Sequence, residues 1–231
     1  LKTSNGTAFL FPFIIWEKEL KESGIEVSLF SKDSNELFEC DFLCIDSKFL
    51  ADKWATFRNE TEQIYEKYSN LVNAVLYFDT TDSTGMDNTY PLPYVKAWVK
   101  NQLLIDKEAY LKPIAANGRI YGEYVYKKGL IEDNNFIYSE PIQNIQDLNK
   151  LKLGWNSGLA NYSLFGPSIL KLKDKIGLQR FLNFKKAISS PHKFRKKDIC
   201  CRFGYKYVHN GISWYRKSLS NLLKGNIDTN K

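Results

Sequence analysis

Acidic and hydroxyl side chains follow directly after an apolar run that has the composition of a buried strand. The run 72–78 is mostly apolar without alternation, which is typical of a parallel strand buried on both faces. Ligands of open parallel sheets bind beside the carboxyl ends of the strands. Asp79 and Asp82 are therefore candidate catalytic residues that could orient a sugar hydroxyl, act as a base or hold a cation. Ser83 and Thr84 follow as candidate substrate-binding residues, and the alternative is a turn in which Asp82 and Ser83 bond to backbone N–H groups.

A second polar group follows the short strand expected at 151–155. Asn156 can donate and accept hydrogen bonds, which suits sugar hydroxyls, and Trp155 or Tyr162 could stack on a pyranose ring. We expect these side chains to share a single crevice with Asp79. The alternative is a tight turn at Gly158 with Trp155 in the core.

Basic residues are concentrated in the last quarter of the chain. Residues 170–231 hold 16 Lys+Arg and 3 Asp+Glu, a net charge of +13, whereas the remainder carries a net charge of −6. Such a region attracts phosphates of nucleic acids, lipid head groups or nucleotide-sugars. Arg202 and Arg216 could pair with a diphosphate, because guanidinium geometry matches phosphate oxygens, while the neighbouring lysines suit an ordinary solvated surface.

Other chemistries find less support in the sequence. The four cysteines, Cys40, Cys44, Cys200 and Cys201, have spacings that fit no common zinc module, so we expect reduced core residues and no metal site. The two histidines have no Ser or Cys partner at a telling spacing for a hydrolase. A phosphatase-like nucleophile at Asp79 would need a second aspartate at the position of Thr81, so aspartate-based phosphoryl transfer stays only as an alternative.

Strand-like and helix-like segments alternate along the chain, which predicts an α/β fold with a Rossmann-like parallel sheet and helices on both faces. Residues 3–7 are expected to form a loop before a helix that begins at Pro12 and ends at Gly24. Lys96, Lys100 and Lys107 are expected on the solvated face of a helix. The expected strands are 25–30, 42–45, 72–78, 151–155 and 198–203, and the expected helices are 12–23, 54–71, 94–111, 168–187 and 212–223.

A break near 189–191 divides the chain into a first domain, 1–190, and an incomplete second α/β unit, 191–231. The second unit has one expected strand and one helix, which cannot bury a sheet face. The chain opens as loop, helix and strand, so we expect that the first strand of a βαβ unit is missing.

Several segments in this order resemble a family of bacterial glycosyltransferase-like proteins of the GT-B type, associated with surface polysaccharide synthesis. The resemblance covers nearly the whole chain, and the order and spacing of its individually weak motifs carry it. The segments are Phe13-Ile14-Ile15-Trp16-Glu17-Lys18-Glu19-Leu20, Tyr77-Phe78-Asp79-Thr80-Thr81-Asp82-Ser83, Leu92-Pro93-Tyr94-Val95, Gly154-Trp155-Asn156-Ser157-Gly158-Leu159, Arg202-Phe203-Gly204-Tyr205 and Ile212-Ser213-Trp214-Tyr215-Arg216.

The resemblance implies that 1–190 is the acceptor-side domain and 191–231 the start of the donor-side domain. It implies transfer of a sugar from a nucleotide-sugar, as co-substrate, to a saccharide or lipid-linked acceptor, with no other cofactor and no bound metal. Most donor contacts would lie beyond Lys231, so we expect little activity from the chain as given.

We expect a cytoplasmic protein, because no stretch reaches the roughly 18 apolar residues of a membrane span. Peripheral contact with the inner membrane surface is compatible with the basic region. No nucleic-acid partner is expected, although an RNA-binding module built from the basic, aromatic C-terminal region is the alternative.

Overall fold

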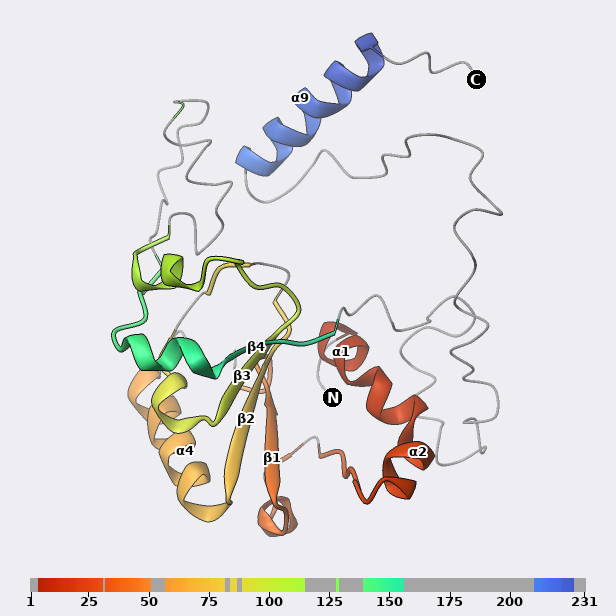
Figure 1. The fold of residues 1–231 in the computed structure, drawn as a ribbon, viewed down its shortest axis with the longest axis vertical. Coiled ribbons are helices and arrows are strands. Elements are labelled where there is room, and N and C mark those ends of the chain that lie inside the picture. Colours follow the sequence, from red (N-terminus) through yellow and green to blue (C-terminus); the bar gives the residue numbers. More distant parts are fainter. Residues whose placement is uncertain are drawn as a thin grey trace.

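A four-stranded, fully parallel sheet forms the centre of the described fold (Figure 1). The computed structural model describes residues 4–30, 32–50, 57–81, 84–86, 89–114, 128, 139–155 and 210–226. The strands follow one another in chain order as β1 (Phe42–Asp46), β2 (Ala74–Asp79), β3 (Ala97–Lys100) and β4 (Leu151–Leu153). The parallel sheet with helices confirms the predicted α/β, Rossmann-like class, and β1, β2 and β4 confirm three expected strands.

Side chains on β2 alternate between the two faces of the sheet. Tyr77 is paired in register with Ile45 on β1 and Trp98 on β3, and all three are buried. The Tyr77 and Trp98 rings lie 4.3 Å apart between their centroids. Phe78 points to the opposite face and is also buried, so the apolar run of this strand serves two cores at once.

Helix α4 (Arg58–Leu71) covers one face of the sheet (Figure 1). Thr61, Tyr65 and Tyr68 recur at helical spacing and are the buried residues of this helix. The Tyr65 ring contacts the Tyr77 ring with 6.0 Å between centroids. The 3₁₀ segments η2 (Leu92–Tyr94), η3 (Lys107–Leu111) and η4 (Ile145–Lys150) continue this layer.

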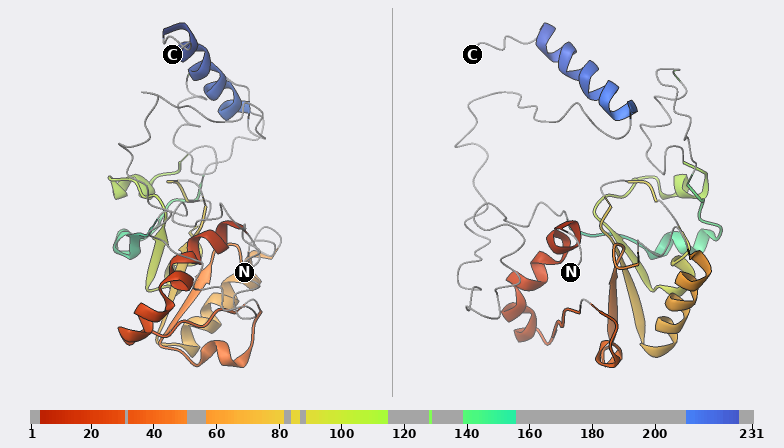
Figure 2. Two further views of the ribbon diagram at one scale, coloured as in Figure 1. Left: turned by 90° about the vertical axis from the view of Figure 1, so that its right-hand side faces the viewer. Right: turned by 180° about the vertical axis from the view of Figure 1, so that it is seen from behind.

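Helices α1 (Ser4–Ile15) and α2 (Glu17–Glu22) lie on the other face, and the further views show the same arrangement (Figure 2). Phe9, Phe11 and Ile14 are buried, and the Phe9 ring lies 5.4 Å from the ring of Phe78. The sheet is therefore covered on both faces, as predicted.

The start of the chain differs from the sequence prediction. The helix begins at Ser4, with Pro12 inside it, so the expected loop over 3–7 and the helix start at Pro12 are wrong. Burial of the apolar residues of α1 against the sheet outweighs the cost of an internal proline. The helical path is interrupted at Trp16 and ends before Gly24, whose φ of +80° confirms its predicted role.

No strand forms over 25–30, although the residues alternate as a strand would. Ile25, Leu29 and Phe30 are 51%, 45% and 37% exposed. Alternation predicts a strand only where a neighbouring strand accepts its hydrogen bonds, and the described residues give this segment none. It links α2 to the 3₁₀ segment η1 (Asn35–Phe38).

The helix predicted over 94–111 is also wrong. The segment contains β3, which pairs with β2 on one side and β4 on the other, and then η3. Val95 and Trp98, three residues apart, fit a helix, but short apolar runs do not distinguish helix from strand. Pairing on both sides decides the outcome in favour of a strand.

Helix α9 (Asn210–Asn226) confirms the helix expected at 212–223 and continues past Gly225. Among the residues that the structure describes, no helix has the length and hydrophobicity needed to cross a bilayer. The helix expected at 168–187, the strand expected at 198–203 and the proposed domain break near 189–191 lie outside the described residues.

Candidate functional site

Three charged residues end three neighbouring strands at the same edge of the sheet. Asp46 ends β1, Asp79 ends β2 and Lys100 ends β3, and Trp155 follows two residues after β4. Because all four strands are parallel, their carboxyl ends share one edge, which is where α/β proteins bind ligands. This edge is the candidate site.

Asp79 and Lys100 form a buried ion pair. Lys100 Nζ lies 2.5 Å from Asp79 Oδ2, with the two side chains 0% and 5% exposed. Trp98 Nε1 also donates to Oδ2 at 3.2 Å, while Thr81 donates to Oδ1 from its backbone N–H at 3.0 Å and its hydroxyl at 2.6 Å. Each carboxylate oxygen therefore accepts two hydrogen bonds from the protein. Asp79 is engaged as an anchor and has no exposed oxygen for a substrate hydroxyl in this arrangement.

Lys100 was expected on a solvated helix face, and this expectation is wrong. Its side chain lies on the same face of the sheet as Trp98, beneath the layer that contains α4, and it is fully buried. Its charge is compensated only by Asp79 among the ion pairs of the described residues. A buried lysine of this kind is retained in the core because its partner is buried with it.

Asp46 has a different environment from Asp79. Its Oδ1 accepts a hydrogen bond from Lys48 N at 3.0 Å and another from the Thr80 hydroxyl at 3.0 Å. Ser47 Oγ lies 3.2 Å from Thr80 Oγ1 and accepts from Thr80 N at 3.2 Å. The described residues donate no hydrogen bond to Asp46 Oδ2. One oxygen is thus held by the ends of β1 and β2.

Burial raises the pKa of the Asp46 carboxyl above its ordinary value, although the hydrogen bonds from Lys48 and Thr80 oppose this effect. A carboxylate with a raised pKa is a stronger base. Asp46 was not selected from the sequence. The available signal was the same one that selected Asp79, namely an aspartate at the end of a predicted strand with a hydroxyl residue, Ser47, after it.

The raised pKa gives a testable pH dependence. Ionising Asp46 costs more in the folded state than in the unfolded chain, so its contribution to stability is lost as pH rises from its unfolded pKa through its raised folded pKa. Asp46→Asn keeps an oxygen that can accept from Lys48 and Thr80 but carries no charge. We expect the variant to equal or exceed the wild type in urea denaturation near neutral pH, with the difference vanishing near pH 3.8 and below. The difference in unfolding free energy between Asp46→Asn and the wild type is measured at both pH values. The assignment is contradicted if this difference favours the wild type more at neutral pH than at acidic pH.

Trp155 lies in the packing between the sheet and α1. Its ring stacks on Phe9 with 4.8 Å between centroids and meets the edges of Phe13 and Phe78 at 5.2 and 6.0 Å. Its Nε1 donates to Phe9 O at 2.5 Å. These contacts agree with the alternative interpretation of the sequence, in which Trp155 is part of the core.

Asp79 and Trp155 consequently do not share a crevice. Asp79 lies on the α4 face with Trp98, whereas Trp155 contacts Phe78, which points to the α1 face. The expectation of a single crevice joining them is wrong, because consecutive residues of a strand point to opposite faces. Asp46 pairs in register with Phe78, so Asp46 and Thr80 lie on the same face of the sheet as Phe78. On this face, the candidate site is centred on Asp46 instead of Asp79.

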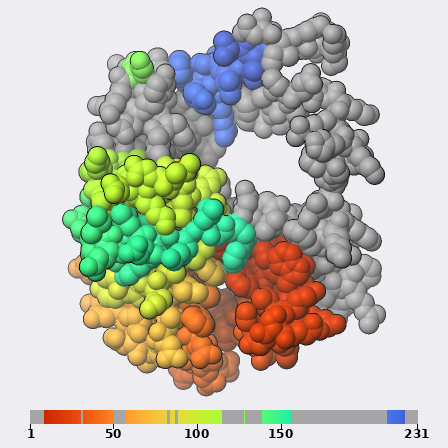
Figure 3. All heavy atoms as spheres, viewed as in Figure 1, coloured from red at the N-terminus to blue at the C-terminus, as the bar shows by residue number. Residues whose placement is uncertain are grey.

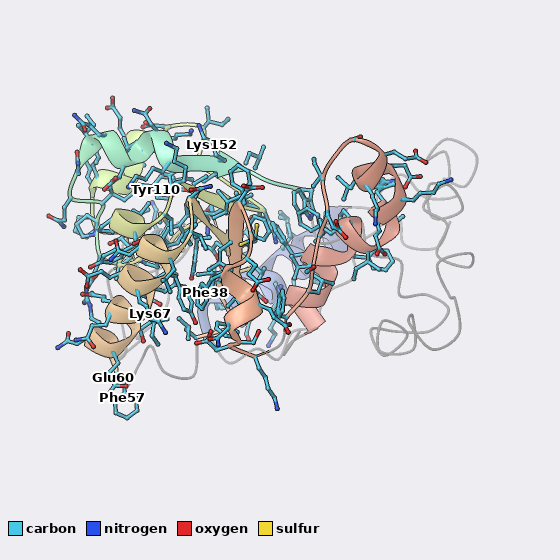
Figure 4. The ribbon with its side chains drawn as sticks, turned by 90° about the horizontal axis from the view of Figure 1, so that it is seen from below. Phe38, Phe57, Glu60, Lys67, Tyr110 and Lys152 are labelled. Carbon is cyan, nitrogen blue, oxygen red and sulfur yellow. The ribbon has the colours of Figure 1, made fainter. Side chains whose placement is uncertain are left out.

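Thr84 contributes through its backbone. Its carbonyl accepts a hydrogen bond from the hydroxyl of Tyr110, a buried residue of η3 labelled in Figure 4. Tyr110 OH also accepts from Leu104 N at 3.1 Å, so Thr84 is placed by the segment after β3. Arg216 lies on α9, away from the sheet (Figure 1). Asp82, Ser83, Asn156, Tyr162 and Arg202 lie outside the described residues.

Cys40 and Cys44 carry free thiols and are exposed, so the expectation that they are core residues is wrong. Leu43 and Ile45, the alternate residues of β1, fill the core instead. Within the described ranges, no group of three or more His, Cys, Asp or Glu side chains could hold a metal ion. The chain matches no family model, and no curated protein or solved structure is detectably similar to it.

Proposed function

We propose that the chain belongs to a glycosyltransferase that moves a sugar from a nucleotide-sugar to a hydroxyl of a saccharide or lipid-linked acceptor. The observation that carries the proposal is Asp46 at the carboxyl edge of the sheet, with one oxygen held by Thr80 and Lys48 and the other unbonded to the described residues. The parallel α/β fold and the ordered sequence motifs support the same class of enzyme.

Asp46 would act as the general base of this reaction. As the acceptor oxygen forms a bond to the anomeric carbon of the donor sugar, its proton passes to Asp46 Oδ2. The bond between the anomeric carbon and the nucleotide phosphate oxygen breaks, and its electron pair leaves with the nucleotide. The hydrogen bonds to Oδ1 fix the carboxylate, and its raised pKa favours proton acceptance.

Asp79 would act by positioning. Asp79 accepts two hydrogen bonds from Thr81, which fix the backbone directly after β2. Thr80, which lies between these two residues, donates its hydroxyl hydrogen bond to Asp46. The phosphoryl-transfer alternative requires Asp79 itself to attack a phosphorus atom. Its four hydrogen bonds and its burial favour the positioning role over that attack.

The test measures the transfer rate of the protein as it is produced in the cell. The rate is monitored through the nucleoside diphosphate released from each of a panel of nucleotide-sugars. Asp46→Asn is expected to lower turnover by at least about 100-fold, the usual contribution of a general base. We expect Asp46→Asn to be at least as stable as the wild type, so the loss of turnover should occur without a loss of stability.

Glu60→Gln is the matched control, since Glu60 is an exposed carboxylate on α4, labelled in Figure 4, and should leave turnover unchanged. Unchanged turnover in Asp46→Asn would remove Asp46 from the mechanism. A protein that transfers or hydrolyses no nucleotide-sugar in the panel would reject the glycosyltransferase proposal itself.

A further inference from the structure

Helix α9 has an apolar stripe and a polar face. At about 100° per residue, Tyr215, Leu219, Leu222 and Leu223 fall within one sector roughly 100° wide. Lys217 and Asn221 fall on the other side of the helix. This is the pattern of a helix whose stripe contacts an apolar phase while its other side meets water.

Two residues of the stripe, Tyr215 and Leu222, are exposed, while Leu219 and Leu223 are partly buried. Leu222 is 61% exposed and Tyr215 is 48% exposed, and Trp214 beside them is 39% exposed. Helix α9 lies away from the sheet and from the helices that cover it, and it forms a separate group of coloured atoms in the space-filling view (Figure 3). The core of the sheet is therefore not what covers this stripe.

The charge of α9 indicates the chemistry of its partner. The helix contains Arg216, Lys217 and Lys224 and no acidic residue, and 170–231 as a whole has a net charge of +13. An anionic partner is favoured by this charge, and an apolar one by the leucines. We propose that α9 docks on the surface of an anionic lipid bilayer, with its leucine stripe among the acyl chains and its lysines at the head groups.

A nucleic acid explains the same residues less completely. Single-stranded nucleic acids are bound by positive charge together with stacking on aromatic rings. Trp214, Tyr215 and Lys217 would fit that mode, but the exposed Leu222 has no aromatic ring on which a base could stack. In a bilayer the leucines, the interfacial aromatic rings and the cations each have a partner. The described helices include none that could span the bilayer, so α9 would lie on it.

This inference goes beyond the proposed function and does not depend on it. It is tested by co-sedimentation of the whole chain with vesicles of phosphatidylcholine and with vesicles of equimolar phosphatidylcholine and phosphatidylglycerol. We expect binding to the anionic vesicles only. Raising ionic strength from about 0.1 M to about 1 M, which shortens the screening length from ~10 to ~3 Å, should weaken it.

Two neighbouring residues of α9, Leu222 on the stripe and Asn221 outside it, give a matched pair of variants. Leu222→Ser removes apolar area from the stripe and should weaken vesicle binding by about ten-fold or more. Asn221→Ser changes the polar face and should bind as the wild type does. Lys217→Gln combined with Lys224→Gln should weaken binding roughly 30-fold, because each cation near an anionic surface contributes separately.

Tyr215→Ser is a second stripe variant, and circular dichroism establishes that each variant keeps its helix content. Equal binding of Leu222→Ser and Asn221→Ser would overturn the proposal. Binding that ignores phosphatidylglycerol would do the same. If labelled oligouridine binds the chain and the vesicles do not, α9 is a nucleic-acid helix and the lipid proposal is rejected.

Discussion

Replacing Lys100 with methionine is expected to lower the free energy of unfolding by about 3–5 kcal/mol, the usual cost of breaking a buried ion pair from one side. Methionine fills a similar volume, so the loss comes from Asp79, which would remain buried without its 2.5 Å partner. Trp98 and Thr81 would still donate to Asp79, but neither carries a charge. The measurement is urea denaturation followed by circular dichroism.

Two comparisons isolate this effect from the loss of any lysine. Lys96→Met, four residues earlier on an exposed side chain, should change stability by less than about 0.5 kcal/mol. Asp79→Asn combined with Lys100→Met should be more stable than Lys100→Met alone, because the double variant leaves no uncompensated charge. If Lys100→Met is as harmless as Lys96→Met, the pair is not buried in solution as the structure shows.

The ion pair also connects the core to the candidate site. Asp79 holds Thr81, and Thr80 between them binds Asp46. A displacement of Asp79 would therefore also move the Thr80 hydroxyl, which holds the proposed base, Asp46. The buried ion pair and the proposed base are thus linked through adjacent residues at the end of one strand.

The central strands and α4 could be predicted because their signals are local. The run 74–78 is apolar enough to be buried on both faces, and the tyrosines of α4 recur at helical spacing. The helix predicted over 94–111 is wrong for the opposite reason, because the strand in this segment is not specified by local signals. Its strand, β3, has four residues and is specified by pairing with β2 and β4, and β4 lies about fifty positions further along the chain.

Lys100 shows why the charge pattern misled the prediction. A lysine is normally solvated, and nothing in its neighbourhood of the sequence marks this one as buried. Its partner Asp79 lies 21 positions earlier and reaches it only because β2 and β3 are adjacent in register. Buried ion pairs of this kind are therefore invisible to residue-by-residue analysis.

Pairing between strands also decides how many hydrogen bonds each aspartate at the strand ends accepts from the described residues. The sequence predicted a candidate site at this edge of the sheet, because aspartates and hydroxyl residues stand at the ends of two of its strands. It could not distinguish Asp79 from Asp46, since the difference lies in contacts with Trp98 and Lys100 on another strand. The alternatives left open for Trp155 likewise depended on Phe9, at the far end of the chain.

Replacing Trp155 with alanine is expected to cost about 3 kcal/mol of folding free energy, at the lower end of the range for large aromatic side chains because Trp155 is half-buried. The indole ring joins the chain after β4 to α1 through Phe9 and Phe13, and to the sheet through Phe78. The neighbouring backbone cannot move in to fill the cavity freely. Gly154 N donates to Lys100 O at 2.7 Å, and a Cβ on Gly154 would lie 2.7 Å from Val99 Cγ1.

Trp155→Phe separates the ring from its hydrogen bond. It keeps an aromatic ring between Phe9 and Phe78 but loses the bond from Nε1 to Phe9 O, so we expect a smaller loss of about 1 kcal/mol. Urea denaturation followed by circular dichroism is the measurement, because the fluorescence of the other tryptophans would complicate the signal. A sugar-stacking residue would behave differently: alanine would leave unfolding unchanged and weaken only ligand binding. That outcome would return Trp155 to the site and would mean that α1 is held to the sheet by other contacts.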